Sequence, residues 1–80
     1  MKQHMTYEER AKIFRERFRK VRERDSTWWE TADKVCTTPD AAKNWGNKHM
    51  PSTATIIKIA EVYDVSIDWL MGLTDARRMP

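Results

Sequence analysis

The sequence predicts a single all-α domain, and three features of its 80 residues indicate this fold class. Glycine and proline are scarce, at two and three residues, and no stretch alternates apolar and polar residues for long enough to form a sheet. Apolar residues instead recur at spacings of three and four, as on one face of a helix. Because 40% of the residues are hydrophobic, including four Trp, the chain can bury a modest core. We expect a compact domain of five helices.

The first predicted helix covers residues 7–24 and is both amphipathic and basic. Its apolar stripe consists of Ala11, Phe14, Phe18 and Val21. Residues 8–25 hold eight basic and five acidic side chains, whereas residues 26–80 are close to neutral. Such a basic stripe can face phosphate, or it can be a solvated face supported by pairs such as Glu8 with Lys12.

The second and third helices are predicted from their N-terminal signals. Thr27 followed by Glu30 has the form of a capping box, which opens a second helix that runs to about Val35. Residues 36–38 break the pattern. A threonine cap, a proline in the first turn and an acidic residue after it then favour a third helix ending near Trp45.

Two more helices follow the polar loop at residues 46–51. Ser52 caps a fourth helix, whose apolar stripe stops at Asp64, and Ser66 caps a short fifth helix that Gly72 can close. That stripe consists of Ile56, Ile59, Ala60 and Tyr63. We therefore expect an N-terminal tail at 1–6, a domain at 7–73, and a polar, loose C-terminal tail at 74–80.

The second and third helices form a sharp corner, because only two or three residues join them. The small residue Ala32 allows their backbones to approach closely. The outer side of the third helix is polar and has the width and chemistry to enter a DNA major groove, where Asn can read adenine and Lys can read guanine. An ordinary helical hairpin would also have a polar outer face, so both interpretations stay open on spacing alone.

A family resemblance favours the DNA interpretation. The stretch PSTATIIKIAEVYDVSIDWLMG, residues 51–72, resembles the fourth and fifth helices of the lambda-repressor-like helix-turn-helix family, also called the Cro or XRE type. The similarity extends upstream to about residue 14. It implies a five-helix domain whose second and third helices form the helix-turn-helix, and which binds operator DNA, commonly as a dimer. The class that it suggests is a phage or prophage repressor or Cro-like transcriptional regulator.

The chain departs from the family pattern at three positions. Trp28 stands where the family usually has a Gln that contacts DNA, and Trp can donate one N–H but accept nothing. Cys36 stands at a turn position often held by Gly, so a left-handed backbone there would be strained. Gly46 stands where the family often has a Glu that pairs with a first-helix Arg resembling Arg22.

From these patterns we expect three groups of site residues. The residues expected to contact bases are Thr38, Asp40, Lys43, Asn44 and Asn47, with Asp40 acting more as a helix cap than as a base reader. The residues expected to contact the DNA backbone are Arg22, Thr27, Trp28, Lys48 and His49, together with other first-helix arginines. Ile67 and Met71 are the expected homodimer surface, and two third helices would then read a near-palindromic operator.

Composition argues against several other classes of protein. One cysteine and two histidines can build neither an internal disulfide nor a closed zinc site, and no nucleophile lies at a catalytic spacing from a base. We expect no enzyme activity, no cofactor, no metal and no small-molecule substrate. No apolar run approaches the ~20 residues that span a bilayer, so a cytoplasmic protein is expected. The alternative is a protein-interaction module of the same fold, for partner docking or toxin neutralisation, anchored by Trp28 or Trp29. These adjacent residues cannot both face the core.

Overall fold

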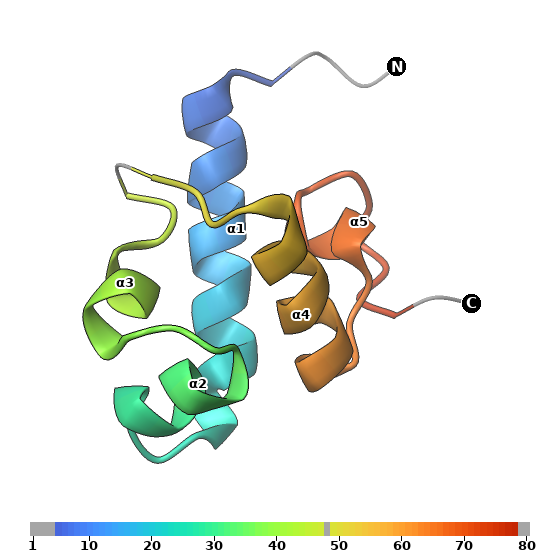
Figure 1. Ribbon diagram of the computed structural model, residues 1–80. Coiled ribbons are helices and arrows are strands. Elements are labelled where there is room, and N and C mark those ends of the chain that lie inside the picture. Colours follow the sequence, from blue (N-terminus) through green and yellow to red (C-terminus); the bar gives the residue numbers. More distant parts are fainter. Residues whose placement is uncertain (1–4, 48, 79–80) are drawn as a thin grey trace.

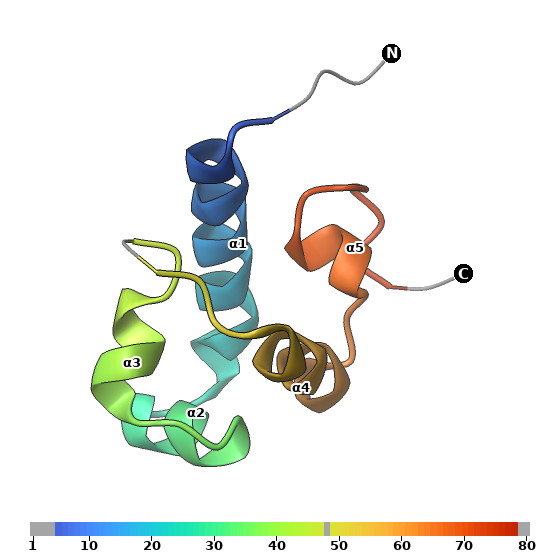
Figure 2. The ribbon, with the colours of Figure 1, turned by 45° about the horizontal axis from the view of Figure 1, so that its top comes forward.

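The computed structural model describes residues 5–47 and 49–78, and every regular element in this part of the chain is helical. The elements are α1 (Tyr7–Val21), the 3₁₀ turn η1 (Arg22–Arg24), α2 (Trp28–Lys34), α3 (Pro39–Asn44), α4 (Thr53–Tyr63) and α5 (Ile67–Leu70). The longest helix, α1, runs through the molecule, with α2 and α3 along one side and α4 and α5 along the other (Figures 1 and 2). The predicted five-helix all-α fold is confirmed. None of the described helices has the length and apolar character that crossing a membrane requires.

Each helix begins at a side chain that accepts a backbone N–H. The caps of α2 to α5 are the expected residues Thr27, Thr38, Ser52 and Ser66. At the start of α1, Thr6 and Glu9 form a complete capping box, with each side chain accepting the other's backbone N–H. The predicted box at α2 is only half formed, because Glu30 accepts instead from the N–H of Ser26.

The core is centred on α1. Phe14 and Phe18 are no more than 1% exposed, and the predicted apolar stripe of α1 is buried throughout. The ring of Phe18 lies 5.4 Å from that of Trp45 and 6.5 Å from that of Tyr63, measured between centroids. Phe18 therefore joins the end of α3 to α4 through α1, which fixes the two halves of the domain against one shared residue.

The arginines of α1 are bound to the C-terminal ends of other helices. The last carbonyls of a helix lack partners within it and carry a partial negative charge. Arg15 donates to the carbonyl oxygens of Lys43 and Trp45, both at 3.0 Å, and Arg19 donates to that of Lys43 at 2.9 Å. Two guanidinium groups from α1 thus close the end of α3.

The same arrangement recurs at α4 and α5. Arg10 donates to the carbonyl of Met71 at 2.7 Å, and Arg17 donates to that of Trp69 at 2.6 Å. From η1, Arg24 donates to the carbonyl of Val62 near the end of α4. The basic stripe is therefore largely used inside the domain, a role that differs from both a phosphate-binding face and a purely solvated one.

The C-terminal segment at 74–78 lies against α5 and α1 instead of being loose. The N–H of Ser66 donates to the carbonyl of Arg77 at 2.9 Å, and Arg17 pairs with Asp75 at 3.1 Å. The guanidinium of Arg77 also lies 5.1 Å from the ring centre of Trp69. The sequence predicts a loose tail over 74–80. Its described part, 74–78, is instead held in place, because the N–H of Ser66 at the start of α5 takes the carbonyl of Arg77 as its partner, which the polarity of the segment does not reveal.

Candidate nucleic-acid interface

The corner between α2 and α3 is closed by a left-handed residue. Cys36 has a φ of 61°, and the next residue, Thr37, donates its N–H to the carbonyl of Ala32 at 2.9 Å. Ala32 is 2% exposed, as expected for a close approach of two helices. Val35, Ala42 and Trp45 fill the inner side of the corner and are buried. The two helices are thus separate and are held at a fixed angle.

The residues expected to contact bases lie on α3 and directly beside it: Asp40, Lys43 and Asn44 belong to the helix, Thr38 is its N-cap, and Asn47 lies in the loop that follows. Thr38, Asp40, Lys43, Asn44 and Asn47 are all exposed. Thr38 also caps the helix, since its Oγ1 accepts the N–H of Ala41. The Nδ2 of Asn44 donates to the carbonyl of Asp40 at 2.8 Å, which uses one of its two N–H groups. The other N–H and the Oδ1 remain, and these are the two groups that adenine recognition requires.

A hollow of about 570 Å³ lies beside this helix face and is lined by Asp40, Ala41, Asn44, Trp45, Asn47 and His49. Its far wall is the loop after α3, where the N–H of Gly46 donates to the carbonyl of His49 at 2.8 Å. Gly46 has a φ of 82°, and a Cβ there would lie 2.6 Å from the Cβ of Arg15. The loop can take this course only because Gly46 has no side chain against α1.

The residues expected to contact the DNA backbone lie in different environments. Thr27 and His49 are exposed, and Lys48 lies outside the described residues. Trp28 is half-buried, with the guanidinium of Arg22 3.9 Å from its ring centre. The Nε of Arg22 donates to Thr31, and its Nη2 is buried without a hydrogen-bond partner. Arg22 and Trp28 therefore form a stacked pair in the present structure.

A buried carboxylate that the sequence analysis did not single out links α2 to α4. Asp25 is 4% exposed and accepts from Thr31 Oγ1 at 2.7 Å and Tyr63 Oη at 2.6 Å. It also pairs with Lys34 Nζ. Burial alone would raise the pKa of Asp25, but these hydrogen bonds, led by that from Lys34, hold it below its ordinary value. Burial and the bond to Asp25 raise the pKa of Tyr63.

No local signal identifies Asp25 in the sequence, because its three donors lie 6, 9 and 38 positions away. The hydrogen bonds of Asp25 nevertheless have a clear structural role. Thr31 and Lys34 belong to α2 and Tyr63 belongs to α4, so one carboxylate fixes the helix-turn-helix to the rest of the domain.

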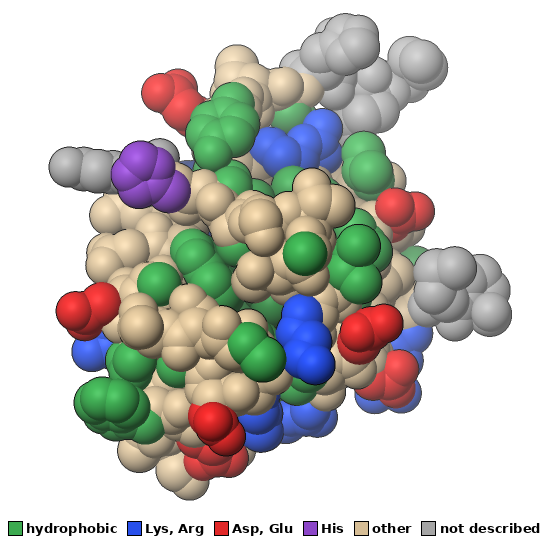
Figure 3. All heavy atoms as spheres, viewed as in Figure 1, with side chains coloured by type: hydrophobic (Ala, Val, Ile, Leu, Met, Phe, Trp, Pro, Cys, Tyr) green, Lys and Arg blue, Asp and Glu red, His purple; other side chains and the backbone are tan. Residues whose placement is uncertain are grey.

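The exposed surface of the corner is not basic. On α2 and α3 the exposed charged residues are Glu30, Asp33, Asp40 and Lys43. The ammonium of Lys34 is bound to Asp25 and lies 3.7 Å from Glu30. On the face that Figure 3 shows, Lys and Arg side chains are scattered and do not form one patch. Any attraction of this surface to phosphate would therefore come from individual side chains and not from a continuous basic patch.

The two residues expected at a dimer surface differ in exposure. Ile67 is 39% exposed, whereas Met71 is half-buried against the core. Ile57 on α4 is 41% exposed and was not among the expected residues. A hollow lined by residues of α4, α5 and the segment between them, including Ala60, Val65 and Ile67, lies on this side of the domain.

Comparison with known protein families agrees with this geometry. The sequence model of the family described as helix-turn-helix matches residues 18–70, which is more than half of the chain. Searches of curated proteins and of solved structures gave no significant match. The family match begins at Phe18, in the centre of the core, and ends at Leu70, the last residue of α5. The chain therefore belongs to the lambda-repressor-like, Cro/XRE-type helix-turn-helix family of DNA-binding regulators.

Proposed function

We propose that this protein is a sequence-specific transcriptional regulator that places α3 in the major groove of an operator. The observation that carries the proposal is the position of Lys43 and Asn44. Both side chains are exposed on a helix that is capped by Thr38 at its start and closed by Arg15 and Arg19 at its end. A recognition helix that is fixed at both ends loses little conformational freedom when it binds DNA.

Lys43 both takes part in fixing the end of α3 and offers a side chain for DNA contact. Its carbonyl accepts hydrogen bonds from Arg15 and Arg19, while its ammonium group is exposed to solvent. We assign Lys43 to guanine and Asn44 to adenine, each contact worth roughly 1–3 kcal/mol of discrimination. Thr38 and Asn47 flank them, and Asp40 either caps the helix or accepts from a cytosine amino group.

The contacts to phosphate follow from the flanks of the corner. The proposed contacts are the start of α2 at Thr27 and Trp28, Lys48 and His49 after α3, and Arg22 if it leaves its stack on Trp28. Because most α1 arginines are bound to carbonyls, we assign only about two neutralised phosphates to each protomer. The logarithm of the binding constant should then fall with the logarithm of salt concentration with a slope of about −2 per protomer.

We further propose that the protein binds as a homodimer through the side of the domain that carries Ile67 and Met71. Two copies of α3 would then enter successive major grooves about 34 Å apart, on a near-palindromic operator. Occupancy of the operator would exclude or recruit polymerase, as in a phage or prophage repressor or Cro-like switch.

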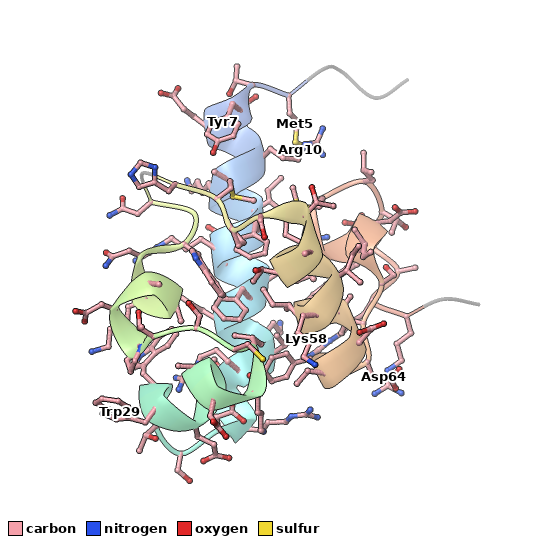
Figure 4. All side chains as sticks on the ribbon, viewed as in Figure 1. Met5, Tyr7, Arg10, Trp29, Lys58 and Asp64 are labelled. Atoms are coloured by element: carbon pink, nitrogen blue, oxygen red, sulfur yellow. The ribbon has the colours of Figure 1, made fainter. Side chains whose placement is uncertain are left out.

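Selection of bound sequences from a random duplex pool tests the proposal. We expect an enriched near-palindrome at moderate salt, and Lys43→Ala combined with Asn44→Ala should lower affinity for it by at least about 100-fold. Lys58→Ala is the matched control. Lys58 is exposed on α4 (Figure 4), and its substitution removes one positive charge, as Lys43→Ala does. A pool without enrichment, or a double variant that binds like the wild type, would refute the regulator proposal.

A further inference from the structure

The outer face of α2 is occupied neither by the core nor by the residues proposed to read bases. It consists of Trp29, Glu30 and Asp33, and we call it the α2 outer face. Trp29 is 74% exposed, more than any other large hydrophobic side chain among the described residues. Its ring points away from the body of the domain beside α2 (Figure 4). A tryptophan so exposed offers a large apolar area, and this residue type is enriched among binding hot spots.

The charges around Trp29 favour a cationic partner. Asp33 follows Trp29 by four positions, so the two lie on the same side of the helix, and Glu30 is beside them. Asp33 and Glu30 are exposed. The one base of α2, Lys34, is bound to the buried Asp25 and also lies 3.7 Å from Glu30, so Lys34 does not neutralise both exposed carboxylates and the face remains acidic. A phosphate backbone would be repelled by these carboxylates, whereas a basic segment of a protein would be attracted.

The domain itself shows what kind of cation a tryptophan in this chain accepts. Guanidinium groups of Arg22 and Arg19 lie 3.9 and 5.1 Å from the ring centre of Trp28. Trp69 likewise has two, from Arg17 and Arg77, each at 5.1 Å. Trp29 is more exposed than either, and none of the arginines in the described ranges 5–47 and 49–78 lies over its ring.

We propose that the α2 outer face docks an arginine-bearing segment of another protein. A guanidinium stacks on the indole of Trp29 and donates to the carboxylate of Asp33 or Glu30 at its edge. The planar guanidinium of arginine suits this geometry better than the compact ammonium of lysine, which has no plane to stack on the ring. The face shares no residue with the base-reading set on α3. The docking proposal therefore goes beyond DNA binding and does not depend on it.

The test follows the indole N–H signals of the ¹⁵N-labelled full chain by NMR while a blocked seven-residue peptide with three arginines is added. Trp29→Phe removes one signal and so assigns it. We expect the Trp29 signal to move saturably with this peptide and to move much less with the lysine or glutamate versions. Since the whole chain carries a net charge of +3, a cationic peptide has no general attraction to it. A Trp29 signal that does not move, or moves equally with lysine, would overturn the proposal.

Variants locate the binding. Trp29→Ala should abolish saturable peptide binding, and Asp33→Asn should weaken it about two- to five-fold. Tyr7→Ala is the matched control, because Tyr7 is an aromatic residue that is 63% exposed at the opposite end of the molecule (Figure 4). All three side chains are exposed, so the variants should melt at the wild-type temperature, which shows that they fold.

The same variants distinguish this inference from the DNA proposal. Trp29→Ala should bind the selected operator with wild-type affinity. If it instead loses affinity as the Lys43 and Asn44 double variant does, Trp29 is a DNA contact and the docking proposal is wrong. If the wild type binds no duplex but binds the arginine peptide at Trp29, the regulator proposal fails and the docking site stands.

Discussion

Helices α1 and α3 both have a polar side, but their polar side chains have opposite roles. On α1, Arg10, Arg15, Arg17 and Arg19 reach across to carbonyls at the ends of other helices. On α3, Lys43 extends into solvent, and Asn44 makes one bond, within its own helix. The arginines of α1 thus serve the packing of the domain, whereas the side chain of Lys43 is exposed.

The difference teaches that the charge of a segment does not identify the surface that binds a polyanion. The basic α1 supports the fold, and the nearly neutral α3 is the proposed reading helix. The two helices meet at the loop after α3, where the backbone of Gly46 lies against Arg15 and Ala11. Substitutions near this contact and its supports should therefore separate stability from DNA binding.

The largest effect is expected from Gly46→Ala. A Cβ would lie 2.6 Å from Arg15 Cβ and 2.8 Å from the carbonyl oxygen of Ala11, at a φ of 82°. We expect a loss of about 3 kcal/mol in the free energy of unfolding, measured by urea denaturation. Gly72→Ala is the control, because its φ is 80° but its Cβ would meet only side-chain atoms, those of Ile13 at 3.0 and 3.1 Å and Arg10 Nη1 at 3.5 Å. Equal losses would show that α1 does not contact the loop closely.

Asp25→Asn should cost about 2–3 kcal/mol, because it leaves Lys34 and Tyr63 without their charged acceptor. The pKa of Asp25 is lowered by folding, so its carboxylate contributes stability that is complete above its ordinary pKa of 3.8. That contribution is lost as the pH falls below 3.8 toward the lower pKa of the folded state. The difference in unfolding free energy between wild type and variant should therefore shrink in acid. A difference that stays constant with pH would contradict this role.

Arg15→Ala combined with Arg19→Ala should cost about 1–2 kcal/mol, because the carbonyls of Lys43 and Trp45 lose their donors. Operator affinity should also fall several-fold, since the end of α3 is less firmly held. Lys12→Ala combined with Lys20→Ala is the control. Both lysines are exposed on the same helix, and their substitution removes two positive charges, as the arginine pair does. If both pairs weaken DNA binding equally, α1 acts through its charge and not through α3.

The smallest effect, and the only gain, is expected from Cys36→Gly. Cys36 has a φ of 61°, which strains a residue with a Cβ. Glycine should relieve this strain and stabilise the domain by about 0.5–1 kcal/mol in thermal unfolding. Cys36→Ser keeps the strain and should leave the melting temperature unchanged. A loss of stability with glycine would mean that the flexibility it adds to the unfolded chain outweighs the relief of strain.

The helix starts could be predicted because each depends on neighbours in the sequence. A capping side chain needs only the backbone N–H two or three positions later, as at Thr38 and Ser52, and the apolar stripe of α1 follows from helical spacing alone. Even here one detail depended on tertiary structure, because Glu30 bonds to Ser26 instead of completing the box with Thr27.

The roles of the charged residues could not be predicted, because they depend on which helix ends become neighbours. Arg15 reaches a carbonyl 28 positions away, and Asp25 reaches the hydroxyl of Tyr63 38 positions away. The same holds for Arg22, which stacks on Trp28. Of the candidate site, the outer side chains of α3 could be identified from spacing, whereas the supports that fix the helix became visible only in three dimensions.

The shortness of α3 has a consequence for how much information one protomer can extract. Six residues rise about 9 Å along the helix axis, and base pairs stack about 3.4 Å apart, so α3, as the proposed recognition helix, would span only about three or four of them. A sequence of about three or four base pairs recurs throughout any genome. In the proposed homodimer, discrimination between genes would come from two such half-sites at a fixed separation, so the length of the spacer between them would carry as much information as their base sequences.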